Sequence, residues 1–271
     1  MNAWETWISN WINQIPLKDS SHPLMISSDF SNMAAKAVSM RCKADPLALI
    51  RGIEVKWPGI TILIPAFKDH YQLGEYFDPQ NTLPDTGSLA RKALKDPSFL
   101  RTSDPLHSFL IKGPLSNSCM QMADESTFGK HSVFGWLHRH HAYQLLIDID
   151  LQHSFTFAHY VEEQLQVSYR KYKNLIIPVK QYGEKMVEKK VKFFSKKPGY
   201  KLHLNGLQTS LANGGALILG ELDGISWMLI DLSKAYELIV DEIQNHQARN
   251  LIIFDLNQFL RDIVKKLLKR A

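Results

Sequence analysis

The segment from His153 to Glu163 combines the residue types that acid–base chemistry needs. It has the sequence His-Ser-Phe-Thr-Phe-Ala-His-Tyr-Val-Glu-Glu. Thr156 and Glu162 lie three residues on either side of His159, so on a helix both can flank its imidazole on one face. A histidine titrates near neutral pH, and a neighbouring carboxylate suits it to act as a general base. The same spacing also fits a core histidine satisfied by its neighbours, so spacing alone leaves both interpretations open.

A buried strand followed by a helix is expected to hold this segment. The apolar run at 143–149 predicts the strand. Thr156 is a natural N-cap for a helix whose pattern Glu163 continues. We therefore predict a strand, a short loop and a helix, with His159 in the first helical turn.

Four acids are candidates to contact this imidazole. Asp148 and Asp150 lie in or just after the predicted strand, and Glu162 and Glu163 lie on the predicted helix. Glu162 has the spacing that shares a helical face with His159. The sequence does not decide which of the four touches the ring.

Several segments together resemble the aminoglycoside 3-N-acetyltransferase family. Thr-Phe-Ala-His-Tyr-Val-Glu-Glu, followed by Val-Ser-Tyr-Arg at 167–170, resembles the active-site segment of that family. The upstream segments that agree with it in order are Thr86-Gly87-Ser88-Leu89, Arg101-Thr102-Ser103-Asp104-Pro105-Leu106-His107-Ser108 and Phe128-Gly129-Lys130-His131-Ser132-Val133-Phe134-Gly135. The resemblance covers about residues 24–172.

The resemblance implies a reaction and a fold. The family transfers the acetyl group of acetyl-coenzyme A (acetyl-CoA) to an amine on a sugar ring, and we expect no metal. His159 would act as the base and Glu162 would orient it, while Thr156 or a backbone N–H at the helix start would stabilise the oxyanion. The implied fold is α/β, a mixed β-sheet with helices on both faces, antibiotic N-acetyltransferase-like and distinct from the GNAT fold.

Contacts to the coenzyme are also carried over from the family. Pro23 to Ile26 predicts a short strand that runs into a serine-rich turn, and such a strand-to-helix junction offers hydroxyls and backbone N–H groups to an anion. A plain capped helix start fits the same turn. The expected coenzyme contacts are Ser28, Asp29, Phe30, Ser31, Arg101, Ser103, His107, Ser108, Ser132 and Phe134.

Departures from the family pattern concern the acceptor. Arg91 stands where the family often has a glutamate, Asp104 replaces a histidine and Val133 replaces a proline. Sites for polycationic aminoglycosides are rich in acids, whereas Arg91, a net charge of +5 and a lysine-rich arm at 184–201 favour an anionic acceptor. We therefore expect Arg91 to help bind a nucleotide-linked (UDP or dTDP) amino sugar, as in surface polysaccharide synthesis. The alternatives are an aminoglycoside 3-N-acetyltransferase that confers antibiotic resistance, and a catalytically silent binding protein on the same fold.

Length and composition fit an ordinary globular enzyme. The 271 residues, 45% of them hydrophobic, predict one large domain with a catalytic core at 1–172 and a C-terminal part at 173–271 that carries the basic hairpin arm and a terminal helix. No apolar run is long enough to span a membrane, and the mild basic excess comes with no nucleic-acid motif. Cys42 and Cys119 are far apart without metal spacing, so we expect reduced thiols in a cytoplasmic protein. The expected partner is a small molecule rather than nucleic acid or a membrane, and the oligomeric state is left open.

Overall fold

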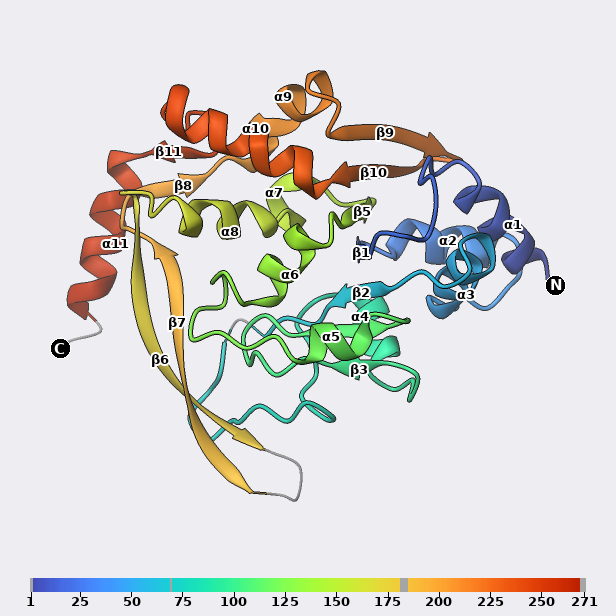
Figure 1. The fold of residues 1–271 in the computed structure, drawn as a ribbon, viewed down its shortest axis with the longest axis horizontal. Coiled ribbons are helices and arrows are strands. Elements are labelled where there is room, and N and C mark those ends of the chain that lie inside the picture. The colour runs from blue at the N-terminus through green and yellow to red at the C-terminus, as the bar shows by residue number, and fades with distance from the viewer. Residues whose placement is uncertain (1, 69, 181–184, 269–271) are drawn as a thin grey trace.

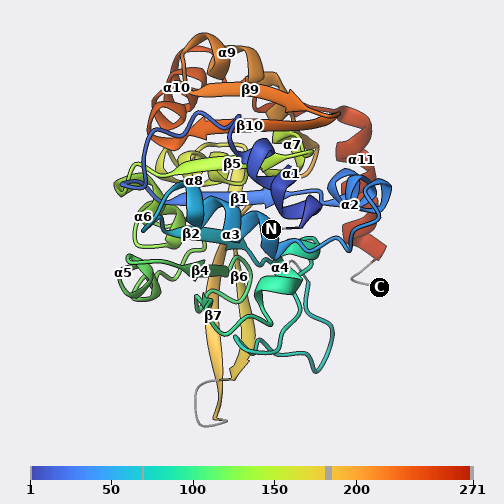
Figure 2. The same cartoon turned by 90° about the vertical axis from the view of Figure 1, so that its right-hand side faces the viewer.

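A seven-stranded mixed β-sheet forms the centre of the computed structural model, which describes residues 2–68, 70–180 and 185–268 (Figure 1). β1 pairs in parallel with β2 and β5, and the remaining neighbours in this sheet pair antiparallel. In spatial order, which Figure 2 shows from the side, the strands are β3 (Leu100–Arg101), β4 (Phe109–Lys112), β2 (Ile62–Pro65), β1 (Leu24–Ser28), β5 (Tyr143–Ile147), β10 (Ile225–Asp231) and β9 (Leu217–Leu222). The predicted α/β class and the mixed sheet are confirmed.

The alternation of side chains along β1 divides the core into two layers. Leu24 and Ile26 pack in one apolar cluster and Met25 packs in the other, because successive residues of a strand point to opposite faces. The first cluster is covered by α1 (Ala3–Ile12), α2 (Ser31–Ser39), α3 (Leu47–Lys56) and α4 (Ser88–Ala93). The second is covered by α6 (Val133–Arg139), α8 (Phe157–Gln164) and α10 (Leu232–Asn245), with the shorter α5 (Ser116–Met120), α7 (Leu151–Ser154), α9 (Gln208–Asn213) and the 3-10 turn η1 (Leu204–Leu207). Helices therefore lie on both faces of the sheet, as predicted.

The tryptophans of the N-terminal helix pack on the core. Trp4 and Trp11 of α1 are fully buried, and α1 lies against α3. Gly52 of α3 permits the close approach, since a Cβ there would lie 2.5 Å from Cδ1 of Ile12.

The lysine-rich arm is one strand of a longer hairpin. β6 (Arg170–Lys180) and β7 (Met186–Lys196) pair over their whole length and project from the body of the molecule (Figure 1). The sequence predicts only a short strand at 175–177 and an arm at 184–201, whose first residue lies outside the described part of the chain. The hairpin turns Ile177, Val179 and Val191 onto Phe77 and Leu106, so its apolar side is covered while Lys190 and Lys192 are exposed.

The C-terminal part extends the same sheet through β9 and β10 and then adds a small second sheet. β8 (Tyr200–Leu202) pairs with β11 (Ile252–Phe254), and the predicted terminal helix is α11 (Leu256–Leu268). Across the described residues, no helix combines the length and apolar character that crossing a membrane requires.

Candidate active site

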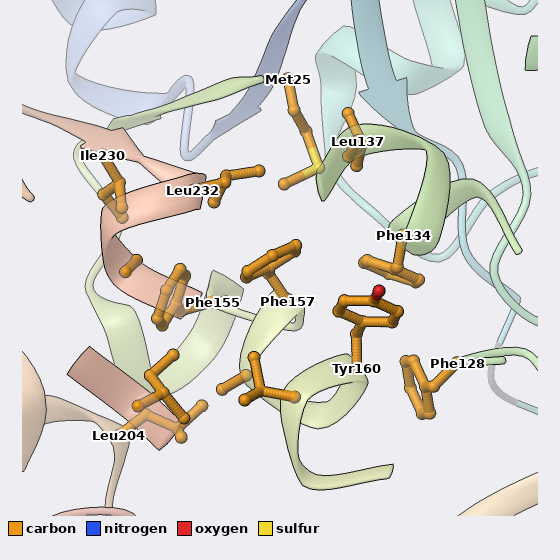
Figure 3. Close-up of a cluster of buried hydrophobic side chains, with 14 of the residues drawn as sticks. Met25, Phe128, Phe134, Leu137, Phe155, Phe157, Tyr160, Leu204, Ile230 and Leu232 are labelled. Carbon is orange, nitrogen blue, oxygen red and sulfur yellow. The ribbon is translucent and has the colours of Figure 1, made fainter. Parts of the chain in front are cut away.

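Aromatic packing fixes the start of α8. Phe155 and Phe157 are fully buried, and Figure 3 shows them side by side in the core; the ring of Phe157 also packs on Tyr160 with centroids 5.4 Å apart. Thr156 occupies the N-cap position, but its φ and ψ of −63° and −21° are helical and its side chain makes no capping hydrogen bond. The predicted Thr156 cap is therefore wrong. The predicted strand–loop–helix order is present, with α7 inserted in the loop.

Glu162 is the acid that contacts His159. Its Oε2 lies 2.8 Å from Nδ1 of the imidazole, and its side chain is fully buried while that of His159 is 14% exposed. A carboxylate only accepts hydrogen bonds, so in this contact Nδ1 donates, and Nε2 keeps the lone pair that a general base needs.

The other three acids have partners of their own. Glu163 accepts a hydrogen bond of 2.7 Å from Ser126. Asp150 caps α7 and lies 2.5 Å from Nδ1 of His153. Asp148 accepts from the backbone N–H and hydroxyl of Ser226. The choice that the sequence leaves open is therefore resolved by geometry in favour of Glu162.

Arg170 completes a buried cluster with this pair. At the first position of β6 and only 5% exposed, it places Nε 2.7 Å from Oε2 of Glu162 and Nη2 2.7 Å from Nδ1 of His159. The sequence points to the segment that contains Arg170 but assigns this residue no role.

Burial and charge keep the resting imidazole neutral. Burial and, after it, the positive charge of Arg170 lower the pKa of His159 to about 4 against the opposing influence of Glu162. For Glu162, burial works to raise the pKa, but His159 and Arg170 outweigh it and hold the pKa of the carboxyl below its ordinary value. At neutral pH the cluster is therefore a carboxylate, a guanidinium and an uncharged base.

A cavity of about 300 Å3 lies at the ends of β1 and β2. Met25, Ile26, Ile64 and Phe134 give it apolar walls. The hydroxyls of Ser27 and Ser28 are buried and find no hydrogen-bond partner among the described residues. A cavity with apolar walls and unmatched hydroxyls fits a flexible chain that carries amide groups.

A second cavity, of about 420 Å3, contains His159. Its aromatic wall joins Phe128 and Phe193 to His107, whose ring stacks on Phe193 with centroids 5.9 Å apart and planes at 17°. The residues that line both cavities, and so mark where they meet, are Phe67, Thr86, His153, Ser154 and Thr156. A donor in the first cavity and an acceptor in the second would meet beside Thr156 and His159.

Only some of the predicted coenzyme contacts line this space. Ser28 and Phe134 line the first cavity and His107 lines the second. Asp104 shapes the loop before His107, because its Oδ1 accepts from the backbone N–H groups of Leu106 and His107 at 2.8 Å each.

The other predicted contacts serve the framework. Arg101 is buried, which lowers its pKa to about 10, and it donates to the hydroxyl of Ser108 at 3.0 Å and to the carbonyl of Ala66 at 2.9 Å. Ser132 caps α6. The remaining four do not line either cavity: Asp29 accepts from the N–H of Ser31, Phe30 packs on Trp4, and the carbonyl of Ser103 accepts from Lys189.

Arg91 also lies outside both cavities. It is exposed in the last turn of α4, and its Nε donates to the carbonyl of Pro84 at 3.2 Å. The β6–β7 hairpin contributes Leu175 and Phe193, and none of its lysines, to the lining of the second cavity.

The described residues contain no group of three or more histidine, cysteine, aspartate or glutamate side chains that could hold a metal ion.

Comparison with known proteins links this geometry to one family. The sequence model described as "Aminoglycoside 3-N-acetyltransferase" matches residues 56–244. A search of curated proteins gives no match.

Solved structures share the fold at low identity. AAC-IIIb, described as a binary complex with CoASH, is 17% identical with a TM-score of 0.76, covering 89% of this chain and 96% of its own. The YokD protein from Bacillus subtilis is 18% identical with a TM-score of 0.71, covering 91% of this chain and 95% of its own. AAC-VIa, described as bound to sisomicin, is 16% identical with a TM-score of 0.70, covering 89% and 97%.

Proposed function

The protein belongs to the aminoglycoside 3-N-acetyltransferase family and is an acetyl-CoA-dependent N-acetyltransferase, and we propose that its acceptor is an amine on an aminoglycoside-type amino sugar. The observation that carries the proposal is the position of His159, paired with Glu162, in the second cavity, which meets the first beside Thr156. A transferase needs donor and acceptor side by side with a base between them.

The first cavity suits the pantetheine arm of acetyl-CoA. The buried hydroxyls of Ser27 and Ser28 would pair with its amides, and the apolar walls around Phe134 would cover its methylenes. The structure of AAC-IIIb with CoASH supports this assignment by analogy of fold. When bound, the cosubstrate supplies an activated acetyl thioester.

His159 would carry the proton transfers. Nε2 takes a proton from the amine nitrogen as the N–C bond to the acetyl carbonyl carbon forms, and Glu162 stabilises the resulting imidazolium. Thr156, where the two cavities meet, is the proposed donor to the oxyanion. As the C–S bond breaks, His159 returns the proton to the departing thiolate, so an amide and a free thiol leave the site with no net change in the enzyme.

The acceptor assignment replaces our expectation from the sequence. The sequence favours a nucleotide-linked amino sugar because of Arg91 and the lysine-rich arm, but neither Arg91 nor a lysine of the hairpin lines the second cavity. AAC-VIa, of the same fold, is described as bound to the aminoglycoside sisomicin, which supports the alternative. A role in surface polysaccharide synthesis has no support from these observations.

The test is thiol release from acetyl-CoA by the purified protein beside its His159→Ala variant. One set of reactions contains aminoglycosides and a separate set contains UDP- and dTDP-linked amino sugars. We expect turnover with aminoglycosides that His159→Ala abolishes. Turnover with nucleotide sugars alone would refute the acceptor assignment, and undiminished turnover by His159→Ala would refute the role of the base.

A further inference from the structure

We propose that Arg170 is a positioning residue that holds Glu162 ionised and His159 neutral, and so sets the charge state of the catalytic pair. The inference rests on the proposed function, because it assigns His159 the role of base. It starts from two contacts of one guanidinium: Nε lies 2.7 Å from Oε2 of Glu162, and Nη2 lies 2.7 Å from Nδ1 of His159.

The guanidinium is fixed from the side that faces away from the pair. Nη1 of Arg170 donates to the carbonyl of Phe194 at 2.9 Å, and Arg170 itself pairs with Lys196 across the hairpin. Nη1 is thus anchored on β7, while Nε forms an ion pair with Glu162 and Nη2 lies in close contact with the protonated Nδ1 of His159. Because the anchor lies on β7, the guanidinium charge stays beside the pair on α8.

The charges around the ring favour one protonation state. The ionisable groups that act on His159 are Glu162 on its own helix, Arg170 on the hairpin and His107 from the loop before β4. Tyr169 acts on Glu162. Protonating the imidazole would place a second cation 2.7 Å from Nη2 in a buried site, while Glu162 remains neutralised by Arg170. Repulsion between these two cations disfavours the protonated ring, and this repulsion is absent when the ring is neutral.

This arrangement explains how one histidine serves both halves of the reaction. A neutral ring offers the lone pair of Nε2 to the amine without first losing a proton to solvent. The imidazolium that forms lies beside Arg170, which makes it a stronger acid, and so it readily returns the proton to the thiolate. Glu162 alone would stabilise the imidazolium and delay that return.

The experiment is a direct titration of His159 by NMR in the full chain with 13C- and 15N-labelled histidine. The His159→Gln variant identifies its signal among the 11 histidines. In the wild type we expect a ring that stays neutral, with the proton on Nδ1, until well below pH 6. Arg170→Gln should raise the pH of titration by at least about one unit, and Arg170→Lys should raise it by less, because an ammonium cannot contact the carboxylate and the ring together.

Lys196→Gln is the matched control. It removes one positive charge from the same hairpin and leaves in place the contacts that the Arg170 guanidinium makes with His159 and Glu162, so the titration should not move. If His159 titrates at the wild-type pH in whichever Arg170 variant folds, or if Lys196→Gln shifts it as much as Arg170→Gln, the proposal is wrong. The titration uses no acceptor, so it can fail or succeed independently of the acceptor proposed above.

Discussion

Replacing Glu162 by glutamine tests the centre of the argument. The change keeps the size of the side chain and removes one charge from a fully buried site, where Oε2 contacts both His159 and Arg170. The Arg170 guanidinium would remain buried without its counter-charge. Breaking a buried pair in this way costs about 3–5 kcal/mol of unfolding free energy. Because about 1 kcal/mol shifts the midpoint by about 2–4 °C in a chain of this size, we expect thermal unfolding at least about 6 °C lower.

Glu162→Gln should also impair catalysis. The amide can donate to Nδ1 as well as accept from it, so the tautomer with a free Nε2 is no longer enforced, and the imidazolium loses its stabilising anion. General base catalysis contributes about 100- to 10,000-fold, and we expect kcat to fall by at least about 100-fold, with the KM for acetyl-CoA little changed. The measurements are steady-state thiol release and thermal unfolding of the same preparations.

Glu163→Gln supplies the control. Glu163 is the next residue on α8 and is 4% exposed, but it contacts Ser126 rather than the imidazole, and burial raises its pKa. A neutral amide there resembles the form that burial already favours, so we expect kcat within about threefold of the wild type and a stability loss of about 1 kcal/mol or less. Equal losses of kcat in the two variants, or an active Glu162→Gln, would refute the assignment.

Three further predictions concern the acid side of the stability profile and the two cavities. The pKa of His159 is lowered from 6.5 to about 4, so between these pH values the unfolded chain binds more protons than the folded one. The free energy of unfolding should therefore fall by about 3 kcal/mol as the pH falls through this window. Denaturant unfolding at several pH values should show a smaller fall in His159→Gln. Ser28→Ala should raise the KM for acetyl-CoA by about 2- to 10-fold by removing one hydrogen bond, while Ser31→Ala, outside the cavity, should not. Phe193→Ala should raise the acceptor KM and leave that of acetyl-CoA unchanged, and Lys190→Ala, exposed on the same strand, should change neither. Equal effects of a variant and its control would contradict either cavity assignment.

The sequence predicts best those parts of the site that are local in the chain. His159 and Glu162 are three residues apart on one helix, and helical geometry alone brings them together. Ser28 is the last residue of β1, so the end of this strand places it at the cavity. The mixed sheet is predicted by the resemblance to the family rather than by periodicity.

The predicted site residues that lie outside both cavities, and the predicted cap, depend on contacts between distant segments. Arg101 is in the matching motif, but whether it contacts a ligand or the carbonyl of Ala66 is decided by how β2 and β3 lie relative to one another. Arg91 carries the expected charge, yet the direction of its side chain on α4 cannot be derived from charge alone. Thr156 has the right residue type for a cap, but aromatic packing around Phe155 gives it a helical conformation instead.

The β6–β7 hairpin both contacts the catalytic pair and forms part of the wall of the second cavity. Its first residue, Arg170, contacts Glu162 and His159, while Leu175 and Phe193 of the same hairpin form part of the cavity wall. The carbonyl of Phe194, next to that wall residue, holds the guanidinium in place. A movement of the hairpin would therefore change the shape of the acceptor cavity and the charge state of the base together. For this reason substitutions in the wall cannot be interpreted as changes of specificity alone, unless the titration of His159 is shown to be unchanged in the same variant.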